Sequence, residues 1–194
     1  ELMLEENNLN ERKEYFSIVK RNSDGLLNII NDLLDMSKIE AGMLNYQIAG
    51  TDLNLLCKEV VNDLSTTTQN DVKLLFKPEK DSFIINTDKQ RLRQVIVNLV
   101  SNACKFTTEG EITISYKQLS TDCLEIRVTD TGIGIATENI PKLFNRFTKL
   151  NSNAKGTGLG LVICKSIIEH LGGEIGIESE LGKGSSFWFT HPIS

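Results

Sequence analysis

The feature that most constrains this chain is a helical pattern of about thirty residues, from Asn10 to Glu40. Apolar residues recur along it at the three- and four-residue spacing of one helix face; they are Phe16, Val19, Leu26, Ile29, Ile30, Leu33, Leu34 and Met36. At 1.5 Å per residue such a helix is roughly 45 Å long, too long for the interior of a small domain. We expect it to pack against another helix in a bundle, often across a dimer. The alternative is an amphipathic helix folded onto its own domain.

The pattern changes after a predicted C-cap glycine, Gly42. We predict strands at 44–48, 73–76, 83–86, 111–116, 123–129, 174–178 and 185–190, and helices at 52–64, 88–104, 140–147 and 158–171. Several strands are consecutive, so the order favours an α+β sandwich over a doubly wound parallel sheet. We expect a helical segment at 1–43, which opens with the end of a preceding helix, and a mixed domain at 44–194.

Composition excludes several classes of protein. The 194 residues are 40% hydrophobic and 24% charged, as in ordinary globular proteins. A net charge of −5 disfavours a nucleic-acid partner. The four scattered cysteines, with only two histidines, show no zinc spacing and predict small buried side chains; they are Cys57, Cys104, Cys123 and Cys164. No apolar run spans a bilayer and no signal peptide opens the chain, so we expect a cytosolic fragment of a longer protein.

A strand-like segment, 124–129, ends at a carboxylate. Asp130 follows it directly, and Gly132 and Gly134 come next. A strand, an acid and a backbone that can approach a ligand closely predict a purine pocket. The same residues also occur in ordinary turns.

Asn98 and Asn102 share one face of the predicted helix 88–104, and Lys105, the residue directly after this helix, lies on the same side. Amide oxygens suit a hard cation such as Mg²⁺, and a nearby ammonium group suits a phosphate. The alternative is that these side chains are solvated at a helix edge.

The glycine series Gly156-Thr157-Gly158-Leu159-Gly160-Leu161 opens the predicted helix 158–171. Amide N–H groups at a helix N-terminus bind phosphates. The preceding segment, 148–156, is a polar predicted loop rather than a strand, so the dinucleotide fingerprint does not fit, and the P-loop motif is absent. We predict a glycine-rich hinge that closes over phosphates.

Taken together, the motifs resemble those of the sensor histidine kinases. In order they are an N-box at 98–106, D-T-G-I-G at 130–134, an F-box at 143–147 and G-T-G-L-G-L at 156–161, while 37–42 looks like the end of the second helix of that family's dimerisation and histidine-phosphotransfer domain. The resemblance covers essentially the whole chain. It implies a Bergerat-type two-layer α/β sandwich, preceded by the remnant of a helical hairpin.

The resemblance also implies an activity, transfer of the ATP γ-phosphoryl group to a histidine, with Mg²⁺ as cofactor. The expected partners are a response-regulator receiver domain and, through the helical segment, a second copy of the full-length protein. Membrane attachment is expected only through parts outside this chain.

Site residues carry over from the resemblance position by position. Asp130 would accept a hydrogen bond from the adenine amino group, Asn102 would ligate Mg²⁺, and Arg146 or Lys149 would lie near the γ-phosphate. The implied catalytic residues are Asn98, Asn102, Lys105 and Arg146. The implied ATP-binding residues are Asn98, Asn102, Lys105, Phe106, Asp130, Gly132, Gly134, Ile135, Phe144, Phe147, Gly156, Thr157, Gly158, Leu159, Gly160 and Ser185.

The chain departs from the family in lacking the acceptor motif H-E-x-x-T-P. Its histidines, His170 and His191, are interpreted as surface residues at the ends of elements, and the acceptor motif is expected upstream of Glu1. A second departure is Asn145, where the family usually has an acid.

Two other functions compete with the kinase. Hydrolytic relatives carry a glutamate one helical turn before the metal-binding asparagine, where this chain has Asn98, which cannot act as a general base. A degenerate interaction module that binds nucleotide without turnover is disfavoured by the intact Asn102, Asp130 and glycine series.

Overall fold

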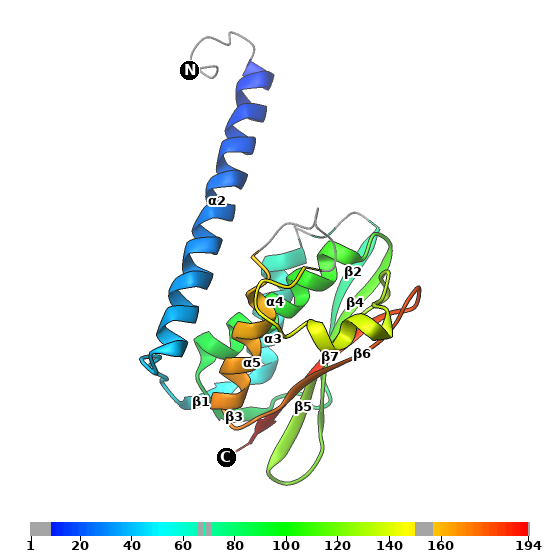
Figure 1. The fold of residues 1–194 in the computed structure, drawn as a ribbon. Coiled ribbons are helices and arrows are strands. Elements are labelled where there is room, and N and C mark those ends of the chain that lie inside the picture. Colours follow the sequence, from blue (N-terminus) through cyan, green and yellow to red (C-terminus); the bar gives the residue numbers. More distant parts are fainter. Residues whose placement is uncertain (1–8, 66–67, 69–70, 150–156, 194) are drawn as a thin grey trace.

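The computed structural model describes residues 9–65, 68, 71–149 and 157–193. A long helix, α2, projects from a layered domain that holds the rest of the described chain (Figure 1). The preceding helix predicted at 1–8 and most of the loop predicted at 148–156 lie outside the described residues.

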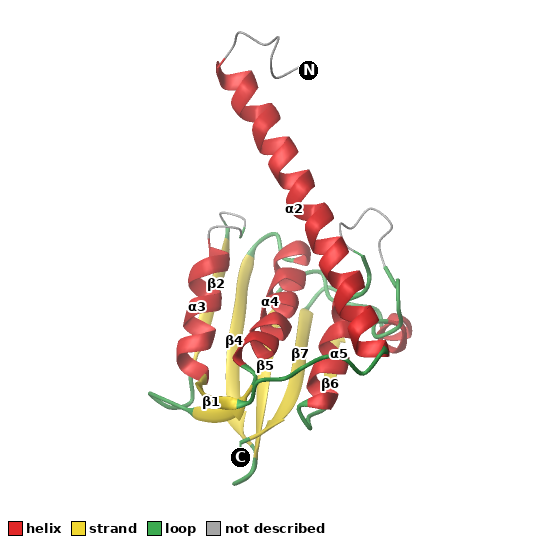
Figure 2. Ribbon diagram, turned by 90° about the vertical axis from the view of Figure 1, so that its left-hand side faces the viewer, coloured by secondary structure: helices red, strands yellow, loops and turns green. Residues whose placement is uncertain are grey.

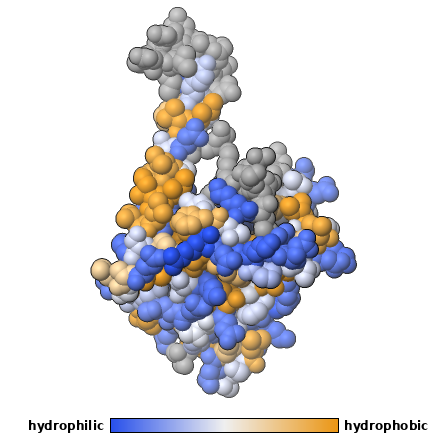
Figure 3. Space-filling view, viewed as in Figure 1, coloured by the Kyte–Doolittle hydropathy of each residue, from blue (hydrophilic) through white to orange (hydrophobic). Residues whose placement is uncertain are grey.

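The long helix is confirmed. Helix α2 spans Leu9–Glu40, 32 residues. It ends in a Schellman motif: Gly42 has φ +63°, its N–H donates to Ile39 O at 3.1 Å, and Met43 N–H donates to Lys38 O at 2.9 Å. Most of the apolar stripe is exposed, and it forms an orange band along the projecting helix in Figure 3. Across the described ranges, no helix is long and apolar enough to span a membrane.

The layered domain is built on a five-stranded sheet with the order β2-β4-β5-β7-β6. Its strands are β2 (Val72–Lys77), β4 (Gly110–Gln118), β5 (Cys123–Asp130), β6 (Ile175–Glu180) and β7 (Gly184–Pro192). Only the β2–β4 pair of this sheet is parallel, because a crossover helix separates its strands; the other pairs are antiparallel. A second, two-stranded antiparallel sheet pairs β1 (Ala49–Asp52) with β3 (Ile84–Thr87).

Three helices cover one face of the large sheet (Figure 2). They are α3 (Leu53–Ser65), α4 (Lys89–Phe106) and α5 (Gly160–His170). The layers meet in one buried core, whose largest fully buried side chains include Leu56, Leu92, Leu99, Ile114, Ile126 and Phe189. The predicted α+β two-layer sandwich is therefore confirmed.

The other face of the sheet is polar. Arg127 forms ion pairs with Glu125 and Glu178. Beside them the indole of Trp188 lies over Gly176, where an added Cβ would come within 2.4 Å of the ring. An alanine at position 176 would therefore collide with the indole.

The strand predicted at 44–48 is wrong, because β1 begins only at Ala49. Side chains anchor the predicted segment instead of a strand ladder. Gln47 N–H donates to the Asp88 carboxylate at 2.8 Å, and the Tyr46 ring stacks on His170. The alternating pattern reflects these separate contacts, which mimic the period of a strand.

Two helix predictions need correction near the glycine series. The helix predicted at 140–147 is a 3₁₀ helix at Thr137–Lys142 followed by turns, and Pro141, which has no N–H, lies inside it. The helix predicted at 158–171 begins at Gly160. Gly158 cannot belong to it, because its φ of +75° is left-handed.

Candidate functional site

Asp130 lies at the end of β5 and is 6% exposed. Its Oδ1 accepts hydrogen bonds from Gly132 N–H at 2.9 Å and from Ser185 N–H at 3.3 Å. Within the described part of the chain, no group donates to its Oδ2. Burial raises the pKa of Asp130, and the two N–H donors oppose that rise. The carboxylate is thus fixed by one oxygen, which leaves the other for a ligand.

The two glycines after Asp130 are required by close backbone contacts. A Cβ on Gly132 would lie 2.3 Å from Phe106 O, and a Cβ on Gly134 would lie 2.0 Å from Glu180 O. Gly134 also has φ +66°. Only glycine lets this turn pass so closely between the end of α4 and β6.

A hollow of about 380 Å³ opens beside Asp130, and Thr129, Ser179 and Ser185 are among its lining residues. Ser185 is 7% exposed, and its hydroxyl lies 3.0 Å from that of Ser179. Ser179 Oγ also accepts from Ile135 N–H at 2.8 Å. Ser179 is a site residue that the sequence did not predict, since an isolated serine in a strand carries no pattern.

The predicted polar face of α4 is present. Lys105 Nζ donates to Asn102 Oδ1 at 3.4 Å. Burial lowers the pKa of Lys105, and the charge of Asp32 partly offsets that effect. Asn98 lies against the start of α5, since a Cβ on Gly160 would be 3.4 Å from its Oδ1. The N-box and the glycine series therefore meet.

The surroundings of Asp130 and the polar face of α4, the two parts of the candidate site, meet at the end of α4. Phe106 O accepts from Ile133 N–H at 3.2 Å, directly beside its contact with Gly132. Contacts therefore run from Asn102 and Lys105, through Phe106, to Asp130.

The described part of the glycine series leads into α5, whose N-cap residue is Leu159. Thr157 Oγ1 accepts from Leu159 N–H at 3.1 Å, and the Leu159 side chain is buried. Gly158 O accepts from the N–H of Phe147, which has a left-handed φ of 59°. Gly156 lies outside the described residues.

The predicted F-box residues are only partly drawn into this arrangement. Phe144 is half-buried, whereas Phe147 is 66% exposed. Arg146 forms an ion pair with Glu40 at the end of α2. The structure therefore places Arg146 with α2 and not with Asn102.

Helix α2 brings further groups to the site, which sequence reasoning missed. Asp32 Oδ2 accepts from Thr157 Oγ1 at 2.8 Å. Asp35 accepts from Arg91 Nη1 at 3.2 Å and from Gln94 Nε2 at 2.7 Å. These acids lie between the apolar residues of α2, and no local motif marks them as site residues.

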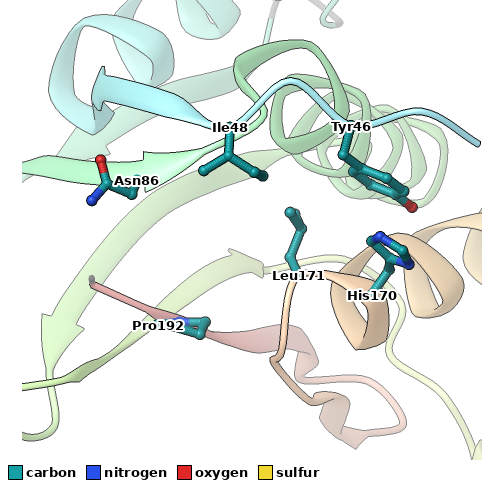
Figure 4. A pocket seen from close by; sticks show the side chains of 6 residues that line it. All are labelled: Tyr46, Ile48, Asn86, His170, Leu171 and Pro192. Atoms are coloured by element: carbon teal, nitrogen blue, oxygen red, sulfur yellow. The ribbon is translucent and has the colours of Figure 1, made fainter.

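The two histidines differ in environment. His170, at the end of α5, is exposed as predicted, and its ring stacks on Tyr46 with centroids 3.9 Å apart (Figure 4). The prediction for His191 is wrong, because it is 1% exposed and its Nε2 lies 2.9 Å from Thr87 Oγ1. The pairing of β7 with β5 carries His191 into the interior, where burial lowers its pKa.

Of the four cysteines, Cys57 and Cys164 are buried and Cys104 and Cys123 are partly buried. All four are free thiols, and burial raises the pKa of Cys57 and of Cys164 to about 12. The interpretation of the cysteines as small buried side chains is fully confirmed only for these two.

Comparison with known proteins agrees with this geometry. A family model described as histidine kinase-, DNA gyrase B- and HSP90-like ATPase matches residues 87–194, more than half of the chain. The chain therefore belongs to this family of ATPases. A second model, the His Kinase A (phospho-acceptor) domain, matches residues 1–42. This pair of domains, in this order, identifies a sensor histidine kinase.

Individual relatives extend over both domains. The sensor protein GacS of Pseudomonas syringae pv. syringae is 38% identical over 200 residues, which cover 97% of this chain and 22% of GacS. Full-length ShkA in complex with AMPPNP has a TM-score of 0.84 at 28% identity, over 95% of this chain and 39% of that one. ThkA in complex with the response regulator protein TrrA has a TM-score of 0.74 at 25% identity, over 97% and 53%. The chain thus spans about a fifth of the length of GacS.

Proposed function

We propose that this chain is the ATP-handling part of a sensor histidine kinase, which transfers the γ-phosphoryl group of ATP to a histidine upstream of Glu1. It would comprise a dimerisation and phosphotransfer segment at 1–43 and a catalytic domain at 44–194. The observation that carries the proposal is Asp130, a buried carboxylate held by two backbone N–H groups with one oxygen available. An acceptor fixed in this way would select the amino group of adenine.

The residues around Asp130 fit ATP. Gly132 and Gly134 form the close turn beside the base, and Ser185 lines the same hollow. Lys105 and the N-terminus of α5 would bind phosphates. Asn102 fits Mg²⁺, because its amide oxygen already faces a cation, the Lys105 ammonium. The metal would neutralise phosphate charge, while the protein groups position the nucleotide.

Complexes of two relatives support the ligand and the partner. ShkA is complexed with AMPPNP and ThkA with the response regulator protein TrrA. A receiver domain of a response regulator would then accept the phosphoryl group from the histidine. The exposed stripe of α2 would pair with a second copy in the full-length protein. We propose a cytosolic location, with membrane attachment through parts outside this chain.

A hydrolytic ATPase is the competing function. It would need a general base next to the metal-binding residue, and the position one turn before Asn102 holds the amide of Asn98. We therefore propose transfer to histidine rather than to water as the main reaction.

The test is phosphoryl transfer in trans. The chain is incubated with γ-labelled ATP, Mg²⁺ and a separate fragment of the full-length protein that carries the upstream acceptor helix. We expect acid-labile label on the histidine of that fragment, and its loss with Asn102→Ala. Tight ATP binding without any transfer would refute the kinase. Steady ATP hydrolysis that Asn98→Ala abolishes would support the ATPase instead.

A further inference from the structure

The carboxylate of Asp32 lies at the phosphate end of the proposed nucleotide site, although it belongs to α2. It accepts a hydrogen bond from the hydroxyl of Thr157, 125 positions further along the chain. Burial raises the pKa of Asp32 and lowers that of Lys105, and the attraction between the two charges opposes both shifts. Asp32 therefore contacts one proposed phosphate-binding residue and interacts electrostatically with a second.

Neighbouring contacts hold Asp32 in this place. Asp35, three residues on, pairs with Arg91, and the two side chains are only 17% and 19% exposed. Gln94 donates to the same carboxylate. At the end of α2, Glu40 pairs with Arg146. Three carboxylates of one helix are thus engaged by α4, the F-box and the glycine series, so α2 is docked over a length of more than two turns.

The phosphates of a nucleotide would use the same groups as Asp32. The hydroxyl of Thr157 has one proton, which it cannot donate to Asp32 and to a phosphate oxygen together. The ammonium of Lys105 would interact with either negative group, and two like charges at close range repel. Occupation of the site by phosphate and docking of Asp32 are therefore in conflict.

We propose that Asp32 makes an autoinhibitory contact, in which docked α2 and the phosphates of ATP compete for Thr157 and Lys105. This rests on the proposed function, because it takes the glycine series and the N-box as the phosphate end of an ATP site. Since the coupling is reciprocal, ATP binding releases α2 and a signal that holds α2 docked weakens ATP binding. The long helix thus connects the state of the rest of the protein to nucleotide affinity.

The experiment is calorimetric titration of the 194-residue chain with ATP and Mg²⁺, and separately with adenosine. Asp32→Asn keeps the shape of the side chain and removes its charge. We expect it to bind ATP about fivefold more tightly, the effect of a partly exposed charge pair worth about 1 kcal/mol. Adenosine, which has no phosphates, is expected to bind both proteins equally. Asp63→Asn is the matched control, since this carboxylate pairs with Arg93 on α4, away from α2.

Several results would overturn the proposal. ATP affinity that is unchanged or lower in Asp32→Asn would show that Asp32 does not compete with phosphate. An equal gain in ATP affinity in Asp63→Asn would show that only the net charge of the protein matters. An equal gain in adenosine affinity in Asp32→Asn would show that Asp32 limits access of any ligand to the site rather than competing with phosphate. Absence of ATP binding in every variant would reject the proposed function as well. ATP binding that Asp130→Asn removes, with no effect of Asp32→Asn, would reject the autoinhibitory contact alone.

Discussion

At the scale of single residues, the two oxygens of Asp130 have different tasks. Oδ1 is occupied by Gly132 and Ser185 N–H groups, which fix the orientation of the carboxylate. Oδ2 is the oxygen left for an incoming donor. Such a division makes the site selective for a ligand that donates a hydrogen bond, because a ligand that cannot donate leaves a buried carboxylate oxygen unpaired.

Asp130→Asn therefore tests the adenine assignment. The amide keeps an oxygen for the two backbone donors but presents an NH₂ group toward the ligand, where two donors would then meet. We expect ATP affinity to fall roughly 10- to 100-fold, the loss of a hydrogen bond to a charged group. Calorimetric titration gives the affinity. Asp122→Asn, at an exposed position, is the control, and wild-type affinity in Asp130→Asn would show that the base binds elsewhere.

The buried His191 predicts a pH dependence of stability. Its folded pKa lies below the ordinary value of 6.5, because burial favours the neutral ring. As pH falls through 6.5 toward the folded pKa, the unfolded chain takes up a proton that the native chain refuses, so stability present at higher pH is lost. The slope reaches at most about 1.4 kcal/mol per pH unit.

Urea unfolding between about pH 8 and 5.5 measures this loss. We expect His191→Gln to flatten the slope, whatever its stability at pH 8, because glutamine does not titrate. His170→Gln, at the exposed histidine, should retain the wild-type slope. Equal slopes in all three proteins would contradict the assignment to His191.

At the scale of elements, the turn after β5 is tightly constrained by its backbone neighbours. Gly134→Ala would add a Cβ at a φ of +66° and 2.0 Å from Glu180 O. We expect a loss of about 3 kcal/mol of unfolding free energy from strain and overpacking together. Gly182→Ala is the matched control, since its φ is +82° but nothing lies within 4 Å of the new methyl group. The control is expected to lose only about 1 kcal/mol. Similar losses in both variants would contradict the steric argument.

The elements that the sequence predicted well are helices with a clear apolar period and recognisable capping residues. Helix α4 begins after Asp88, whose side chain accepts from Arg91 N–H, and α2 ends at Glu40, just before the left-handed glycine Gly42. The errors lie where tertiary contacts replace the local pattern. Segment 44–48 is held by a ring stack and a side-chain hydrogen bond, and His191 is buried by strand pairing. Neither contact leaves a local sequence signal.

The candidate site follows the same rule. Asn98, Asn102 and Lys105 could be predicted because they share the N-box, and Asp130 could be predicted because it begins the D-T-G-I-G motif. Ser179 and Asp32 were missed. Their place in the site depends on which strand or helix lies beside them, a property of the whole fold rather than of their neighbours in sequence.

At the scale of the whole molecule, α2 is held by a few ion pairs and hydrogen bonds and by the buried Met36, while most of its apolar stripe stays exposed. The least exposed of these ion pairs joins Arg91 to Asp35. Arg91→Met would leave Asp35 without its cation, and we expect docking of α2 to weaken. The linker after α2 should then open more often and release Tyr46 from His170.

Cleavage after Tyr46 by chymotrypsin, followed by mass spectrometry, measures that opening. We expect several-fold faster cleavage in Arg91→Met than in the wild type. Arg93→Met is the control, because Arg93 pairs with Asp63 on α3 and not with α2. If the two variants are cleaved at the same rate, the Arg91–Asp35 pair does not hold the helix.

The indole that lies over Gly176 has a practical consequence, because Trp188 is the only tryptophan in the chain. Its fluorescence therefore comes from one known place, the outer face of the sheet. Unfolding of the sheet removes the indole from that glycine and exposes it to water, which shifts its emission to longer wavelength. The protein thus contains its own optical reporter of unfolding, and no dye has to be attached to it.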